Sequence, residues 1–217
     1  MSQARLEAAL ENLPIFPLPN AVLFPQAHLE LHVFEPRYRA MLDVSLRTHR
    51  HLAIAQIVGT AGPGGAPRIA VIAGVGSIER HERLPDGRSH IVLVGRARAV
   101  LDELPFVAPF RRARGRLVPD VDDEAPTPTD ELMLVTAMRS FVEALRQDGP
   151  TITFDRPEGI PAGELAQHAA QHLVFDGRVK QEILEMRSAR ERVERVASEL
   201  LAQRTQLLGA PSASRSN

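Results

Sequence analysis

A glycine-rich stretch, residues 62–65 with the sequence GPGG, is the first place where phosphate chemistry could occur. A phosphate-binding P-loop needs the pattern GxxxxGK[ST], in which a lysine reaches the phosphates and a hydroxyl binds the metal ion. The only lysine of this chain is Lys180, which lies more than a hundred residues further on, within a helical pattern. We therefore interpret residues 62–65 as a flexible loop and predict no cofactor.

A metal site could form from Glu164, His168 and His172, which recur every four residues and so share one helical face. Two histidines with this spacing can bind zinc. The HExxH motif is absent, and the chain has no cysteine to supply a thiolate ligand or nucleophile. The GxSxG motif of serine hydrolases is absent as well. We predict a solvated helix face, no metal and no catalytic residues, with an unrecognised hydrolase as an alternative.

Basic residues could form one RNA-binding surface on two neighbouring strands. The five candidates are Arg96, Arg98, Arg112, Arg114 and Arg116. The last three alternate along a predicted strand, 106–118, and so share one of its faces. No stacking aromatic residue lies within this stripe, and the acidic run 120–124 follows it directly. RNA binding is therefore our alternative hypothesis, behind a solvated or ion-paired face.

Peptide binding is predicted at residues 34–39, FEPRYR, where a strand leads into a helix that begins at Pro36. An arginine here could bind peptide carbonyls and carboxylates, and apolar side chains could form the walls of a groove for extended polypeptide. The candidate binding residues are Phe34, Glu35, Arg37, Tyr38 and Arg39. The purely structural alternative places Phe34 and Tyr38 in the core and pairs an arginine with Glu35.

Strands dominate the first half of the chain. Residues 13–18 and 29–34 are predicted strands, and an exposed edge on the first would offer strand addition as a second mode of peptide binding. A helix over 36–49 and a strand over 52–58 follow. The clearest hairpin joins 69–84 to 88–101 through Asp86-Gly87, a pair that favours a tight turn.

Glycines 74 and 76 lie on one face of the first hairpin strand. A glycine inside a strand is typical of a bulge or of a neighbour that approaches the backbone closely. We therefore predict one of these two features at this position.

Helical patterns dominate the second half, so the chain is predicted to be α+β in two segregated parts. We expect a β-rich part over 1–118, an acidic, proline-rich linker over 119–130, a helical part over 131–208 and a disordered tail over 209–217. Within the helical part, Thr127-Pro128-Thr129-Asp130 is typical of a helix start. The last helix should run unbroken over 178–208, which is about 45 Å at 1.5 Å per residue. Its second half would be free to meet a partner, including a second copy of the chain.

Overall composition limits the class of protein. The formal net charge is −1, which argues against a general affinity for nucleic acid or for a membrane surface. The longest apolar run is far short of the roughly 20 residues of a membrane helix, and the N-terminus has no apolar core typical of a signal peptide. We therefore expect a cytoplasmic protein.

Three blocks of the sequence resemble the N-terminal domain of the Lon protease family. The first is 13–39, LPIFPLPNAVLFPQAHLELHVFEPRYR, and the second is 76–101, which contains an Asp-Gly turn and the pair Gly95-Arg96. The third is 163–201, which includes VKQEIL and RVER. The resemblance covers nearly the whole chain, although none of its motifs is a catalytic signature.

The resemblance implies a PUA-like β-barrel or pseudobarrel with one early helix, followed by a helical bundle with a long last helix. It also implies a non-enzymatic module that binds unfolded or extended polypeptide, as an adaptor or regulator in protein quality control, with a protease or chaperone as a further partner. Lon uses a Ser–Lys dyad for proteolysis, but Lys180 lies in the block that resembles the recognition domain. The chain ends at residue 217, where a Lon protease would continue, so we expect a stand-alone substrate-binding domain.

Overall fold

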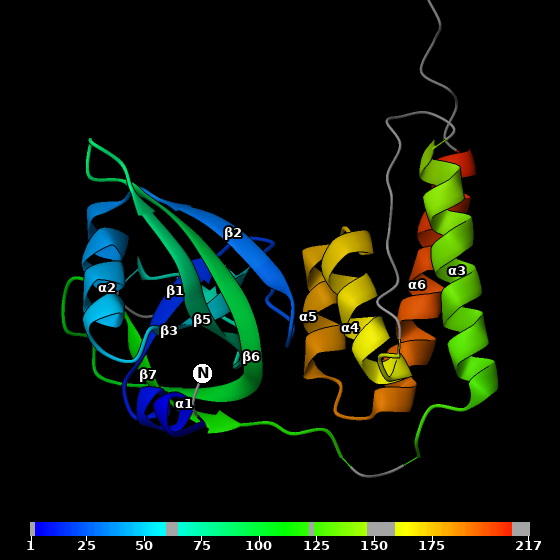
Figure 1. Cartoon of the computed structure of the whole chain (residues 1–217), viewed down its shortest axis with the longest axis horizontal. Coiled ribbons are helices and arrows are strands. Elements are labelled where there is room, and N and C mark those ends of the chain that lie inside the picture. Colours follow the sequence, from blue (N-terminus) through cyan, green and yellow to red (C-terminus); the bar gives the residue numbers. More distant parts are fainter. Residues whose placement is uncertain (1–2, 60–64, 122–123, 147–158, 210–217) are drawn as a thin grey trace, which may run out of the picture. The chain divides into compact units, whose positions relative to one another are not determined.

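The computed structural model describes residues 3–59, 65–121, 124–146 and 159–209, which form two compact units (Figure 1). The sheet unit spans 1–119 and 176–185, and the helical unit spans 120–175 and 186–217. The predicted loop at 62–65, apart from Gly65, lies outside the described residues, and so does the predicted tail beyond Gly209. Within the described part of the chain, we find no helix whose length and hydrophobicity would let it cross a bilayer.

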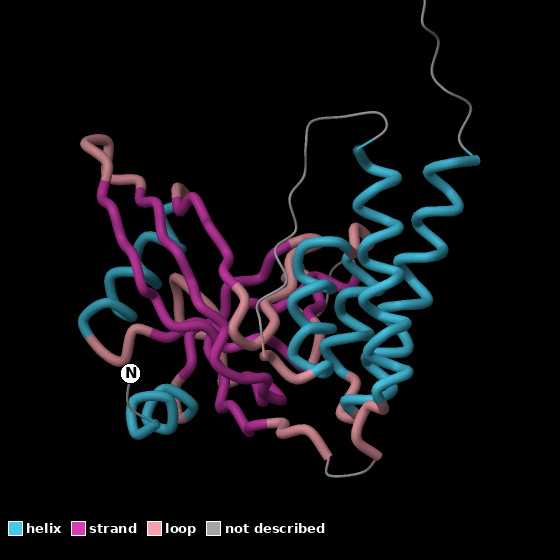
Figure 2. The backbone as a smooth tube through the Cα atoms, turned by 45° about the vertical axis from the view of Figure 1, so that its right-hand side comes forward, coloured by secondary structure: helices cyan, strands magenta, loops and turns pink. Residues whose placement is uncertain are grey.

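A mixed sheet of seven strands forms most of the sheet unit (Figure 2). The strands are β1 (Leu13–Leu18), β2 (His28–Val33), β3 (His51–Gly59), β4 (Arg68–Ile69), β5 (Ile72–Arg83), β6 (Ser89–Glu103) and β7 (Arg112–Leu117). β1 pairs in parallel with β3 and antiparallel with β7, so the path β1-β7-β6-β5-β3 returns to β1 as a ring. The predicted α+β class is confirmed. β3 pairs with residues 15–18 of β1, whereas β7 pairs with Leu13 and Pro14, so the exposed edge predicted on residues 13–18 is covered by β7 only at the start of the strand.

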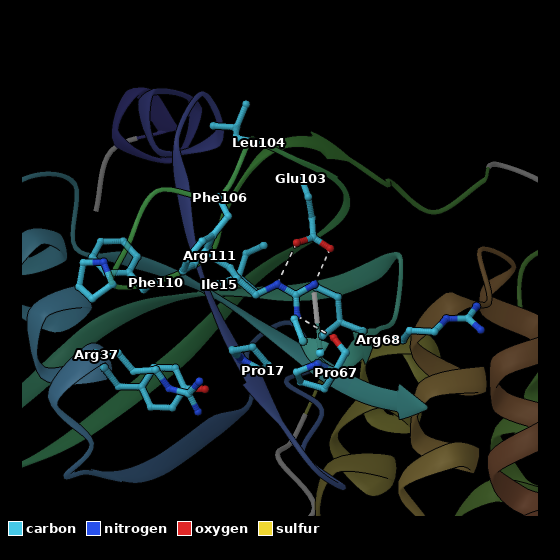
Figure 3. A pocket seen from close by; sticks show the side chains of 15 residues that line it. Ile15, Pro17, Arg37, Pro67, Arg68, Glu103, Leu104, Phe106, Phe110 and Arg111 are labelled. Carbon is cyan, nitrogen blue, oxygen red and sulfur yellow. Dashed lines mark hydrogen bonds and ion pairs between the residues drawn. The ribbon is translucent and has the colours of Figure 1, made fainter. Parts of the chain in front are cut away.

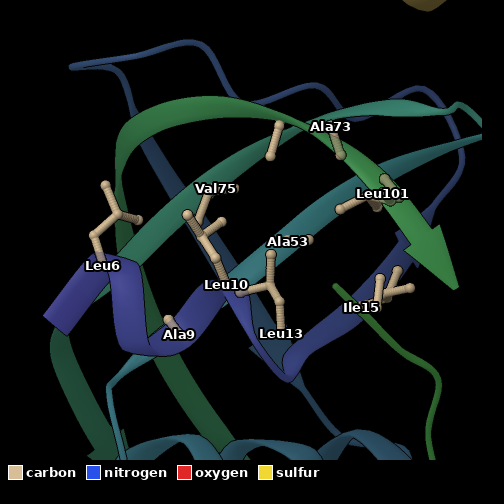
Figure 4. Packing of buried hydrophobic residues seen from close by; sticks show 12 residues of the cluster. Leu6, Ala9, Leu10, Leu13, Ile15, Ala53, Ala73, Val75 and Leu101 are labelled. Carbon is tan, nitrogen blue, oxygen red and sulfur yellow. The ribbon is translucent and has the colours of Figure 1, made fainter. Parts of the chain in front are cut away.

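Helix α1 (Gln3–Leu10) packs into this ring, although the sequence did not predict it (Figure 4). Its buried Leu6, Ala9 and Leu10 join one apolar cluster with residues from β1, β3, β5, β6 and β7. Leu13, Ile15 and Val75 are fully buried members of that cluster. Short helices in water are marginal on their own, so burial of this apolar face is what stabilises α1.

Glycines in β5 and β6 allow the chain between β1 and β2 to pass directly against the sheet. A methyl group on Gly74 would lie 1.9 Å from the carbonyl oxygen of Leu23, and one on Gly95 would lie 1.9 Å from that of Phe24. The Gln26 N–H donates to the Gly95 carbonyl at 2.9 Å. The pairing of β5 with β6 also shifts register between Val75 and Gly76. Both features predicted at residues 74 and 76 are therefore present.

Among its described residues, the helical unit has three helices: α3 (Pro128–Arg146), α4 (Ala162–Leu173) and α6 (Ala189–Gly209). Helix α6 packs against the other two. Asp130 and Thr127 cap α3 reciprocally. The Asp130 carboxylate accepts from the Thr127 N–H at 2.8 Å, and the Thr127 hydroxyl accepts from the Asp130 N–H at 3.2 Å. The helix start predicted at 127–130 is thus confirmed.

The single helix predicted over 178–208 is wrong. The structure has α5 (Gly177–Glu185), a break at residues 186–188, and then α6. The Ser188 hydroxyl accepts from the Glu191 N–H at 3.3 Å and so begins a new helix. The predicted helical part over 131–208 is also interrupted, because α5 packs on β3 and β5 and belongs to the sheet unit.

Candidate functional site

A groove of about 750 Å³ opens on the sheet unit beside β1 and the segment that joins β6 to β7 (Figure 3). Its walls are mainly apolar or aromatic: Ile15, Pro17, Tyr38, Ile69, Leu104, Phe106, Pro109 and Phe110. Three arginines and one glutamate also line it: Arg37, Arg68, Arg111 and Glu103. Clefts of this size that combine apolar walls with a few charged groups are typical ligand sites.

Residues 104–111 form one wall because they leave the sheet. The sequence predicted a strand from Phe106, but β7 begins only at Arg112. Pro109 has no N–H to donate to a ladder, and the segment retains one isolated bridge, between Val107 and Phe110. Phe110 turns into the protein and is 8% exposed, whereas Phe106 is 67% exposed at the edge of the groove.

Arg111 fixes this wall to the opposite side of the groove. Its Nε and Nη2 donate to the two oxygens of Glu103 at 2.8 and 2.6 Å, and its Nη1 donates to the Pro67 carbonyl at 2.8 Å. The Arg111 side chain is largely buried. A paired guanidinium in this setting is held in one orientation, so Arg111 forms a rigid part of the groove.

The other side of the groove is formed by the start of α2 (Pro36–Arg47), whose first position is Pro36 as predicted. The Tyr38 ring is buried against Phe16, with their ring centroids 4.3 Å apart. Burial raises the pKa of the Tyr38 phenol above its ordinary value. The Arg37 guanidinium lies over the Tyr38 ring, 4.5 Å from its centroid, and pairs with Glu35 at 2.8 Å.

Two of the five predicted peptide-binding residues, Arg37 and Tyr38, line the groove. Glu35 does not line the groove, but it forms an ion pair with Arg37, which does. Phe34 is 58% exposed and lies beside the ring of His32, so the structural alternative that placed Phe34 in the core is wrong. Arg39 does not line the groove, and its guanidinium lies close to the Gly87 turn.

The five arginines of the RNA alternative do not form one surface. Arg98 is 4% exposed and donates to the Leu184 carbonyl at 2.8 Å. Arg96 binds the Ser77 hydroxyl at 2.7 Å and Glu79 at 2.5 Å. Arg96 is exposed but paired, Arg98 is buried, and on β7 Arg114 and Arg116 are exposed, with Arg114 facing Asp102 across the strand pair.

The histidines of α4 lie together, with the rings of His168 and His172 in edge contact at 4.8 Å. Within the residues that the structure describes, no group of three or more histidine, aspartate or glutamate side chains is arranged to hold a metal ion. This face of α4 therefore gives no geometric support for a metal centre.

Sequence reasoning missed most of the groove, above all Phe106, Phe110 and Arg111. The segment Leu104-Pro105-Phe106-Val107-Ala108-Pro109-Phe110 did carry a signal. Two prolines four residues apart are incompatible with an internal strand, so they indicate a loop that presents two phenylalanines.

Comparison with known proteins gives a consistent result. The family model described as the ATP-dependent protease La (LON) substrate-binding domain matches residues 12–202. A Lon protease from Chloroflexus aurantiacus is 30% identical over 86% of this chain and 23% of its own length. For a Lon protease from Heliobacterium modesticaldum, the identity is 26% over 95% of this chain and 26% of its own length. The chain thus spans about a quarter of the length of these relatives.

Solved structures agree on the fold. A Lon N-terminal domain protein from Xanthomonas campestris matches with a TM-score of 0.64 and 23% identity, over 86% of this chain and 97% of that one. The N-terminal domain of a Lon protease from the Mycobacterium avium complex matches with a TM-score of 0.62 and 14% identity, over 88% of this chain and 98% of that one. Together with the family model, these similarities show that the chain belongs to the Lon substrate-binding domain family.

Proposed function

We propose that this protein binds extended or unfolded polypeptide in the groove between α2 and residues 104–111, and that it does so without catalysing a reaction. The observation that carries the proposal is the combination of apolar walls, guanidinium groups and an exposed phenylalanine in one open groove. Membership of a substrate-binding family supports it. In this role the protein is an adaptor or regulator in protein quality control, and a protease or chaperone is its natural partner.

Side-chain burial contributes more to this binding than strand addition. The Ile15 N–H already donates to the Arg111 carbonyl at 2.9 Å. The next residue that points to the same edge of β1 is Pro17, which has no N–H. A bound peptide therefore finds few backbone donors here, and it gains affinity mainly by covering Phe106 and the apolar walls. Such binding is weak and tolerates many sequences.

A titration with one polypeptide in its unfolded and folded forms tests the proposal. We expect binding of the unfolded form only, weakened roughly 5- to 30-fold by Phe106→Ala, since burying a phenylalanine contributes about 1–2 kcal/mol at a partly open site. The matched control is Phe175→Ala in the helical unit, because Phe175 is similarly exposed, at 62%. Equal binding of both forms, or equal loss in both variants, would refute the proposal.

A further inference from the structure

We propose, resting on the function proposed above, that the groove prefers segments in which a carboxylate lies next to an aromatic or aliphatic side chain. The carboxylate can be that of an aspartate or glutamate side chain or that of a free C-terminus. Both sources present the same planar anion to the groove.

The charges that line the groove favour an anion. Three arginines but only one carboxylate residue, Glu103, line the groove. Both oxygens of Glu103 are already bound by Arg111, so this carboxylate is neutralised within the wall. Even when Glu35 is counted with its partner Arg37, the arginines outnumber the acidic groups by three to two. Of the three arginines, Arg68 makes no ion pair with another described residue.

Arg37 and Tyr38 supply the donors for that anion. The Nε and Nη2 of Arg37 both reach the same oxygen of Glu35, at 2.9 and 2.8 Å, which leaves Nη1 for a ligand. This pair is exposed, with 54% and 39% of the two side chains accessible, and exposed pairs exchange partners at small cost. The hydroxyl of Tyr38 has no hydrogen-bond partner among the described residues. Because burial raises its pKa, the phenol remains a donor at neutral pH.

The apolar residues of the groove determine which kind of side chain is favoured next to the bound carboxylate. Phe110 lines the same groove as Arg37, on the wall that residues 104–111 form (Figure 3). Phe106 and Pro109 extend the aromatic wall from the same segment. A side chain next to the bound carboxylate therefore meets phenylalanine and proline surfaces, which favour an aromatic or aliphatic group.

A peptide series tests the preference by fluorescence anisotropy with the full chain. Three amidated peptides share one apolar sequence and differ at a single central position, which is Asp, Asn or Lys. A fourth peptide has the Asn sequence and a free C-terminal carboxylate. We expect the Asp peptide, the free-carboxylate peptide or both to bind about five- to tenfold more tightly than amidated Asn, since charge-assisted hydrogen bonds are the stronger kind. The Lys peptide should be weakest.

Variants connect this preference to the groove. Arg37→Gln and Tyr38→Phe should each reduce the Asp-to-Asn affinity ratio towards one, because each removes a donor to the carboxylate. Arg47→Gln is the matched control, because Arg47 is an exposed arginine of α2 that does not line the groove. Equal affinity for all four peptides would overturn the preference and leave the proposed function intact. Failure of every peptide to bind would overturn the proposed function itself.

Discussion

Replacing Gly95 by alanine should destabilise the sheet unit strongly. The added methyl group would lie 1.9 Å from the Phe24 carbonyl oxygen and 2.8 Å from its carbon, and neither backbone atom can move alone. The segment is tied to β6 by two hydrogen bonds of 2.9 Å, from Gln26 N–H to Gly95 O and from Gly95 N–H to Ala27 O. Overpacking costs about 1–3 kcal/mol, and each lost hydrogen bond about 1 kcal/mol. We therefore expect a loss of about 3–5 kcal/mol in the free energy of unfolding.

Urea unfolding followed by tyrosine fluorescence measures this loss. Tyr38 is the only tyrosine and the chain has no tryptophan, so the signal reports the sheet unit alone. Gly59→Ala is the matched control, because a methyl group there meets its nearest neighbour at 3.8 Å, an ordinary contact. The control should change the free energy of unfolding by less than about 1 kcal/mol. If Gly95→Ala unfolds at the same urea concentration as the unaltered protein, our account of the crossing segment is wrong.

Three further predictions concern stability. Arg192 is 1% exposed and pairs with Asp120 at 2.6 Å. Asp120→Ala should therefore destabilise the helical unit by about 1–3 kcal/mol, because it leaves a buried charge unpaired, and Arg192→Met should destabilise it by less. Thermal melts by circular dichroism measure both changes, and the reverse order would contradict this expectation. His49 Nδ1 accepts from the His51 N–H at 3.1 Å, and burial first, then His51, lowers the His49 pKa below 6.5. Because the His49 pKa is lowered in the folded protein, this residue contributes stability above about pH 6.5 that is lost on acidification. The difference between the urea midpoints at about pH 7.5 and about pH 5.5 should therefore be smaller in His49→Asn than in the unaltered protein. An unchanged difference would contradict this. Ser188→Ala should cost about 1 kcal/mol, because it removes the cap of α6; a melt that does not change would refute that role.

Local sequence signals predicted most of the elements. The Asp86-Gly87 pair predicted the β5–β6 hairpin, and Gly87 has the positive φ of 82° that such a turn needs. The Thr127–Asp130 cap and Pro36 likewise predicted the starts of α3 and α2, because each signal depends only on neighbouring residues. The break before α6 also had a local signal, because Ser188 and Glu191 match a capping box. The apolar spacing across residues 186–188 nevertheless favoured one continuous helix.

Features that depend on distant partners could not be predicted in this way. The burial of Arg98 requires a carbonyl of α5, 86 residues away in the sequence. The groove brings together four segments, around Ile15, Tyr38, Ile69 and Phe106, whose proximity follows from the ring of strands. Of the residues proposed within 34–39, Arg37 and Tyr38 line the groove, whereas Phe34 lies beside His32 and Arg39 beside the Gly87 turn.

Backbone amide chemical shifts test the central claim most directly. The isotope-labelled full chain is titrated with an unfolded polypeptide, and shift changes are mapped residue by residue. Binding in the groove predicts the largest changes at residues 104–111, with accompanying changes at Arg68, Ile69, Arg37 and Tyr38. Changes concentrated on the outer arginines of β7 or on the helical unit, with residues 104–111 unmoved, would contradict it.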